Sequence, residues 1–225
     1  VLTDISDFMK LGTSLKVEGT LVNSAVAKDS VEINAESIEV LGECPPEYPL
    51  QKKRHTLEYL RTIPHLRVRT NTFNAVFRVR SVVSAAIHEF FQARHFTYIH
   101  TPLITASDCE GAGEMFKVTT IGYSNEYKNE EEYNAADFFG RRAALSVSGQ
   151  LEGEVAAMAM GKIYTFGPSF RAEKSNTPRH VAEFWHVEPE VAFAELPDII
   201  EIAEDMIKYI IKSVLEKCPE EMKFF

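Results

Sequence analysis

The residues best suited to chemistry in this chain of 225 residues lie between Ile163 and Phe193. The stretch is typical of two β-strands joined by a polar loop, and successive residues of a strand point to opposite faces. Counting by parity gathers apolar side chains on one face, namely Tyr164, Phe166 and Phe170 from the first strand and Trp185, Val187, Val191 and Phe193 from the second. The sequence therefore predicts a hairpin with one buried face and one face that can meet a ligand.

The opposite face carries side chains that an ordinary amphipathic hairpin does not need, although such a hairpin alone would explain the apolar face. Arg171, Glu173, Phe184 and Glu188 share it. An arginine fork matches the oxygen atoms of a phosphate, and a flat ring can stack on a base. Carboxylates accept hydrogen bonds from amino or amide N–H groups. The pattern predicts a site for a nucleotide and an amino acid.

The run FRAE, followed by a loop and by RHVAEFWHVEPE, closely resembles motif 2 of class II (subclass b) aminoacyl-tRNA synthetases, in the form found in asparaginyl-tRNA synthetases. By this resemblance Arg171 holds the α-phosphate of ATP and the activated carboxyl group, and is the main catalytic residue. Glu173 lies beside the adenine and the tRNA end, and His180 lies near the γ-phosphate. Adenine stacks on Phe184. Glu188 selects the side-chain amide of asparagine, where aspartyl relatives have aspartate.

The loop between the two strands holds turn-forming residues and two cations, so it could reach a polyanion. The resemblance assigns its residues Lys174, Ser175 and Arg179 to contact with the tRNA.

Apolar residues recur at helical spacing from Phe73 to Phe91, and a strand-like segment interrupted by Pro102 follows. Any core helix followed by a strand would look similar. The combination nevertheless resembles motif 1, through which class II synthetases form dimers. The resemblance therefore implies a homodimer with Pro102 at its interface.

Two further segments resemble parts of an amino-acid site. ITASDCEGAGEMFKV has two glycines that permit a sharp turn; a flexible acidic loop would explain it, but by resemblance it folds over the amino acid, with Glu110 meeting the α-ammonium group. Ser148 and Gln150 lie at a predicted strand-to-helix junction, where ligands often meet exposed N–H groups. Their sequence, SGQ, resembles the asparaginyl form of a signature that reads SPQ in aspartyl enzymes, so both are expected to bind the amino acid.

The predicted fold class is α+β, an antiparallel sheet flanked by helices. Residues 15–24 and 31–41 alternate as strands do but are too few to close a barrel, so by themselves they indicate a short ribbon. By resemblance they are a remnant of an OB-type anticodon-binding barrel. The proline-rich run GECPPEYPL is typical of a hinge. We therefore expect a barrel remnant over 1–43, a connector over 44–70 and part of a class II catalytic domain over 71–225.

Composition limits the function classes. Hydrophobic residues make up 45% of the chain and charged residues 25%, as in ordinary water-soluble domains. Neither a run of about 18 apolar residues nor a secretory signal pattern is present, so we expect a cytoplasmic protein without membrane partners. The net charge of −9 argues against DNA binding.

The cysteines and the basic residues add two expectations. Three scattered cysteines have no metal-site spacing, so no protein-bound metal is predicted. The stretch from Lys52 to Arg80 has eight basic residues and one acid. It is either a solvated face or an RNA-backbone footprint.

Together the resemblances imply an ATP-dependent asparagine–tRNA ligase that uses ATP with Mg²⁺ to make asparaginyl-adenylate and charges tRNA(Asn) in protein synthesis. Nothing resembles motif 3, so we expect the chain to be a fragment that is inactive alone. An aspartyl-tRNA synthetase or an asparagine-synthesising paralogue remains an alternative, although Glu188 and SGQ argue against the aspartyl option. The more distant alternative is a non-catalytic RNA-binding protein with a synthetase-like body.

Overall fold

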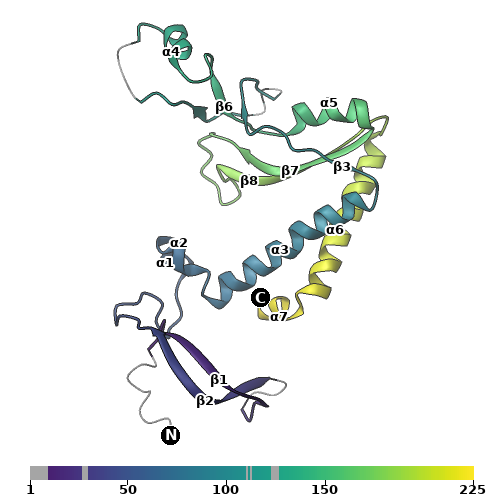
Figure 1. The fold of residues 1–225 in the computed structure, drawn as a ribbon. Coiled ribbons are helices and arrows are strands. Elements are labelled where there is room, and N and C mark those ends of the chain that lie inside the picture. Colours follow the sequence, from purple (N-terminus) through teal and green to yellow (C-terminus); the bar gives the residue numbers. More distant parts are fainter. Residues whose placement is uncertain (1–9, 27–29, 110, 112, 123–126) are drawn as a thin grey trace. The chain divides into compact units, whose positions relative to one another are not determined.

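The computed structural model describes residues 10–26, 30–109, 111, 113–122 and 127–225. Contacts within the chain divide it into two units, Val1–Phe77 and Arg78–Phe225. The helix α3 (Asn71–Gln92) crosses this division, and the elements of both units are drawn in Figure 1. Each unit is described by itself.

The first unit holds a two-stranded antiparallel ribbon. Strand β1 (Ser14–Asn23) pairs with β2 (Val31–Gly42), and the short helices α1 (Leu57–Thr62) and α2 (Pro64–Arg67) follow. Both predicted strands are confirmed. Within the described residues of this unit they form an open ribbon and not a closed barrel. Leu21, Val31 and Ile33 are each more than half exposed, so the ribbon buries little of its apolar surface.

The second unit is built on two small sheets. In the first, β3 (Thr97–Tyr98) runs parallel to β7 (Lys162–Phe170), which pairs antiparallel with β8 (Glu183–Val191). In the second, β6 (Ala143–Leu145) lies between β4 (Ile104–Thr105) and β5 (Lys117–Val118). The helices are α4 (Glu130–Ala136), α5 (Gln150–Met160), α6 (Leu196–Lys217) and α7 (Pro219–Phe224). The predicted α+β class is confirmed.

An aromatic core fills the space between the sheet and its helices. Phe90 and Phe91 of α3 and Tyr164 of β7 are completely buried, and the ring of Phe91 stacks on that of Tyr164 with centroids 4.6 Å apart. Apolar residues of α6 pack against the same cluster. As Figure 1 shows, α3 and α6 lie on one side of β7 and β8, while α5 lies on the other. The aromatic parity of β7 thus gives the face that packs against α3, as predicted. The opposite face of β7 is not open as expected, because Ile163, Thr165 and Ser169 are buried too.

Two residues predicted for the apolar face of the hairpin are exposed. Trp185 packs edge-on against Phe166 with ring centroids 5.0 Å apart, yet it remains 55% exposed. Phe193 is fully exposed and has a φ of 66°. The reason is that β8 ends at Val191 and the chain turns, so strand parity no longer governs the direction of Phe193.

The polar, acidic segment from Ile121 to Ala136 has no apolar periodicity, yet it contains α4. Asn129 caps this helix, because its side chain accepts a hydrogen bond of 2.8 Å from the backbone N–H of Glu132. Three glutamates occupy the first turn, where the helix dipole favours negative charge. The capping asparagine and the acidic first turn are the sequence features that indicate this helix, because the segment has no apolar periodicity.

Every helix in the described ranges is too short or too polar to cross a bilayer.

Replacing Phe91 with Ala should lower the free energy of unfolding by about 3–5 kcal/mol, because it leaves a cavity beneath the sheet against Tyr164. Phe138→Ala is the matched control, since Phe138 is 76% exposed, and it should change stability by about 0.5 kcal/mol or less. Urea unfolding of this chain, followed by circular dichroism, measures both. Equal effects of the two substitutions would contradict the assigned core.

Candidate functional site

A cavity of about 560 Å³ lies where the β7–β8 hairpin opens into its loop. Its walls are made by the residues Arg171, Glu173, Ser175, Arg179, His180, Val181, Ala182 and Phe184. All four residues predicted to bind ATP therefore line one cavity, together with two of the three predicted to contact tRNA. The third, Lys174, is exposed and outside this lining.

Arg171 is placed by the end of the hairpin. It follows the last residue of β7, and its backbone N–H donates to the carbonyl of Ala182 across the hairpin at 3.0 Å. Its guanidinium carbon lies 5.5 Å from the centre of the Phe184 ring. The Nε atom is buried and has no hydrogen-bond partner, alone among buried side-chain nitrogen and oxygen atoms of the described residues. A buried donor without an acceptor is unfavourable, so the geometry favours an anionic ligand here.

The glycine-containing loop before β5 lies directly against this end of the hairpin. The backbone N–H of Ala172 donates to the carbonyl of Glu114 at 2.7 Å. A Cβ atom at Gly113 would lie 2.5 Å from Oε1 of Glu173, so the loop backbone lies close to this side chain. Glu110, predicted to meet the α-ammonium group, lies outside the described residues.

The hairpin loop has its own hydrogen bonds around Thr177. Its hydroxyl is bonded to Nδ1 of His180 and accepts from the backbone N–H of Arg179 at 3.3 Å. The side chains of residues 173–183 are exposed. The loop therefore presents Arg179 and His180 from a defined turn to whatever fills the cavity.

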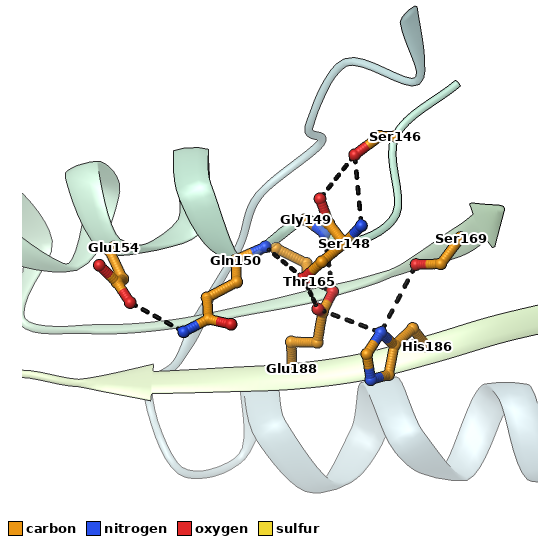
Figure 2. Close-up of polar contacts among 9 residues, drawn as sticks. All are labelled: Ser146, Ser148, Gly149, Gln150, Glu154, Thr165, Ser169, His186 and Glu188. Carbon is orange, nitrogen blue, oxygen red and sulfur yellow. Dashed lines mark hydrogen bonds and ion pairs between the residues drawn. The ribbon is translucent and has the colours of Figure 1, made fainter. Parts of the chain in front are cut away.

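Glu188 lies at the centre of a second group of polar side chains, shown in Figure 2. Ser148 donates to its Oε1, and Nδ1 of His186 lies 3.1 Å from the same atom. Its Oε2 accepts from the backbone N–H of Gly149 at 3.0 Å and from the hydroxyl of Thr165 at 2.8 Å. The side chain of Glu188 is only 10% exposed. The carboxylate is thus held in one orientation from two strands and the turn before α5.

A side chain at Gly149 would crowd the polar side chains around this turn. A Cβ atom there would lie 2.8 Å from Oγ1 of Thr101, 3.0 Å from Oγ1 of Thr165 and 3.2 Å from Oε2 of Glu188. The hydroxyl of Ser146 donates to the carbonyl of Ser148 at 2.6 Å and stiffens the turn. Gly149 therefore leaves space for its neighbours and also donates its backbone N–H to Glu188.

Gln150 was grouped with Ser148 and Glu188 by the sequence, but its side chain turns elsewhere. Its Nε2 donates to Oε1 of Glu154 at 2.9 Å, along α5 (Figure 2). Its backbone N–H donates to the hydroxyl of Ser148 at 3.1 Å. In this structure Gln150 supports the turn and does not touch Glu188.

Glu188 lines a second cavity, which shares no lining residue with the Arg171 cavity, and Ser148 and Gln150 line neither of the two. This second cavity is smaller, of about 190 Å³, and Gly149, Thr165, Thr101 and Trp185 also line it. The exposed Pro102, predicted for a dimer interface, lies between β3 and β4 next to this smaller cavity. Its segment is tied to the site, because the backbone N–H of Ser146 donates to the carbonyl of Leu103 at 2.8 Å.

The network fixes the charge of Glu188. Burial by itself raises the pKa of this carboxyl, but the hydrogen bonds from His186, Ser148 and Thr165 and the charge of His186 outweigh it and lower the pKa to about 2. Glu188 is therefore a carboxylate at neutral pH. It can accept N–H groups from an amide and repels a ligand carboxylate.

Sequence reasoning assigned no role to three groups that hold Glu188. These are the hydroxyl of Thr165, the imidazole of His186 and the backbone N–H of Gly149. Strand parity is consistent with Thr165 and His186 lying on the face of Glu188. Their contact depends on the pairing of Thr165 with Glu188, which only the hairpin register gives.

A family model described as tRNA synthetases class II (D, K and N) matches residues 56–224. The chain is similar to an asparagine–tRNA ligase of Clostridium kluyveri, with 58% identity over 96% of this chain and 47% of that protein. It is 59% identical to one of Acetivibrio thermocellus over the same shares. The chain therefore spans about half the length of these relatives.

Solved structures resemble the chain as well. Asparaginyl-tRNA synthetase of Pyrococcus horikoshii, complexed with asparaginyl-adenylate, superposes with a TM-score of 0.79 and 30% identity, over 95% of this chain and 45% of that one. The Entamoeba histolytica asparaginyl-tRNA synthetase in complex with asparaginyl-adenylate superposes with a TM-score of 0.75 and 25% identity. The match covers 96% of this chain and 46% of that one.

The lowered pKa of Glu188 predicts an acid-sensitive contribution to stability. Because the folded-state pKa lies below the ordinary value of 4.5, at about 2, the contribution is complete above pH 4.5 and is lost as the pH falls through about 2. Wild type should be more stable than Glu188→Gln at neutral pH, and the difference should shrink toward pH 2. Urea unfolding of both chains across this range measures it.

Glu154→Gln, on the exposed surface of α5, is the control and should keep the acid profile of wild type. Hydrogen bonds from Thr119, Thr120 and Phe138 also hold the pKa of Asp137 well below its usual range, but that contribution is the same in all three chains. A difference between wild type and Glu188→Gln that stays constant with pH would contradict the network.

Proposed function

Because this chain belongs to the class II tRNA synthetases of the D, K and N group, we propose that the full-length protein is an asparagine–tRNA ligase. The carboxylate of asparagine attacks the α-phosphate of ATP, which gives asparaginyl-adenylate and releases pyrophosphate. The asparaginyl group then passes to the 3′ end of tRNA(Asn). The relatives named asparagine–tRNA ligase, at 58% and 59% identity, support this substrate.

The observation that carries the proposal is the convergence of Arg171, Glu173, His180 and Phe184 on one cavity. The unpartnered Nε of Arg171 suits the α-phosphate, where negative charge builds up during the attack and a preorganised cation stabilises it. The ring of Phe184 stacks on adenine, with Glu173 beside the base. His180 meets the outer phosphates from the loop. The reaction needs positioning and charge and no covalent nucleophile.

Glu188 and Ser148 form the side-chain end of the amino-acid site in this proposal. A buried carboxylate accepts an N–H group of an asparagine amide, whereas it would repel the carboxylate of aspartate. Glu110 binds the α-ammonium group. Gln150 belongs to the same site in this proposal. Its side-chain amide leaves Glu154 and forms a hydrogen bond with the ligand instead.

ATP brings Mg²⁺ with it in this proposal. In the part of the chain that the structure describes, no group of three or more His, Cys, Asp or Glu side chains could hold a metal ion. The ion is therefore assigned to the ATP phosphates, and no residue of this chain is assigned as its ligand.

Partners follow from the same family. Lys174, Ser175 and Arg179 contact the tRNA end from the exposed hairpin loop, and the protein acts in the cytoplasm. It forms a homodimer through the segment around Pro102, where Leu103 and Ile104 are 41% and 45% exposed. The β1–β2 ribbon is part of an OB-type anticodon-binding barrel over residues 1–43, joined by a connector over 44–70 to the catalytic domain from 71 onward.

The amino-acid substrate is tested by ATP–pyrophosphate exchange with the full-length protein. Exchange should depend on asparagine and stay at background with aspartate, because the ionised Glu188 repels a second carboxylate. Exchange that prefers aspartate would make the protein an aspartyl-tRNA synthetase or an asparagine-synthesising relative. No exchange with either would favour a non-catalytic RNA-binding protein.

Replacing Arg171 with Ala in the full-length protein should slow adenylate formation by roughly a hundredfold or more, the usual effect of losing one preorganised charge contact. Lys174→Ala is the matched loop control, since Lys174 lies outside the cavity lining. It should leave pyrophosphate exchange unchanged and slow only the charging of tRNA. Normal exchange by the Arg171 variant would refute its role.

A further inference from the structure

All the acceptor positions of Glu188 are already taken in this structure. A carboxylate has two oxygen atoms with about four lone-pair sites. Oε1 meets Ser148 and His186, and Oε2 meets Gly149 and Thr165. An amide ligand that donates an N–H to Glu188 must therefore displace one of these donors.

Three of the four donors are fixed. Ser148 and Thr165 are 5% and 3% exposed, and the Gly149 N–H is a backbone donor in a turn that the hydrogen bond from Ser146 to the Ser148 carbonyl holds. His186 differs, because its side chain is 34% exposed. It also has a second partner, since the hydroxyl of Ser169 lies 3.5 Å from the same Nδ1 atom (Figure 2). His186 is the donor that can leave Glu188 with the smallest loss.

We propose that His186 occupies, in the unliganded protein, the place on Glu188 Oε1 that the side-chain amide of asparagine takes, and that ligand binding displaces it toward Ser169. This inference rests on the proposed function and adds a residue that controls affinity at the same site. His186 is here a positioning residue that competes with the ligand and takes no part in the transfer of the nucleotidyl group.

The competition depends on pH because of the charge on the imidazole. A protonated histidine forms a charge-assisted bond with a carboxylate, which is stronger than the bond of a neutral ring. Glu188 remains ionised throughout the range in which histidines ordinarily titrate, since its pKa is about 2. Acid therefore strengthens the competitor without changing the acceptor, and the affinity for the amide should fall.

The other groups around His186 do not replace this effect. On β8 its neighbours on the same face are the Phe184 ring, with centroids 5.5 Å apart, and beyond Glu188 the carboxyl of Glu190. From β7 it faces Gly167 in register and Ser169, and the guanidinium of Arg171 lies beyond, against Phe184. The turn before α5 contributes the uncharged Ser148. Glu188 is the charged side chain for which the structure describes a direct contact with His186.

The test measures the KM values for asparagine and for ATP by pyrophosphate exchange with the full-length protein, from about pH 6 to about pH 8. For wild type, the KM for asparagine should rise toward acid, and this rise should be absent from the His186 variants, whereas any pH dependence of the KM for ATP should be the same in all three proteins. His186→Met, which removes the donor, should lower the KM for asparagine by roughly threefold to tenfold at about pH 6, the worth of one hydrogen bond. It should also flatten the pH profile.

His186→Asn is the conservative variant, because its amide can donate to Oε1 but does not titrate. It should give a pH-independent KM for asparagine close to the wild-type value at about pH 8. A wild-type KM for asparagine that does not vary with pH overturns the inference even if the Met variant fails to fold. So does an unchanged profile in either variant. Absence of any asparagine-dependent exchange in wild type would instead overturn the proposed function.

Discussion

The pairing of Thr165 with Glu188 across the β7–β8 hairpin is the contact on which the site depends. Because side chains alternate along a strand, a slip of one residue would turn Glu188 toward the aromatic core and bring Val187 to the ligand face. The same register pairs Ser169 with Phe184 and leads Arg171 to Ala182. Both cavities are therefore set by one alignment of two strands.

The buried face of the hairpin holds that alignment. Tyr164 and Phe166 of β7 are buried against Phe90 and Phe91 of α3, and a slipped register would expose these rings to water. Burying a large aromatic side chain contributes about 1.5–3 kcal/mol. The core thus stabilises the orientation of Glu188 and Arg171, although neither of these two residues belongs to it.

The two groups on the ligand face differ in how their polar atoms are satisfied. Glu188 has all its acceptor positions filled by protein donors, whereas the Nε of Arg171 is buried without an acceptor. A carboxylate held by four protein donors is rigid and stays ionised, and in our proposal it accepts from a neutral amide after His186 has left. A buried N–H of a cation without an acceptor suits an anionic group that arrives with the ligand. The cavity around Arg171 is also the larger of the two.

The sequence by itself determined the α+β class, the span of α3, the two strands of the hairpin and the shared face of Arg171, Glu173 and Phe184, because parity and spacing are local properties. The place of His180 was implied by the resemblance to motif 2 and not by parity. The sequence did not give α4, the exposure of Trp185 and Phe193, or the direction of the Gln150 side chain. Nor did it give the contacts of Gly149, Thr165 and His186 with Glu188. Those depend on where strands end, on the register between strands and on a turn before α5 that reaches them from another part of the chain. Only the tertiary structure brings such groups within hydrogen-bonding distance.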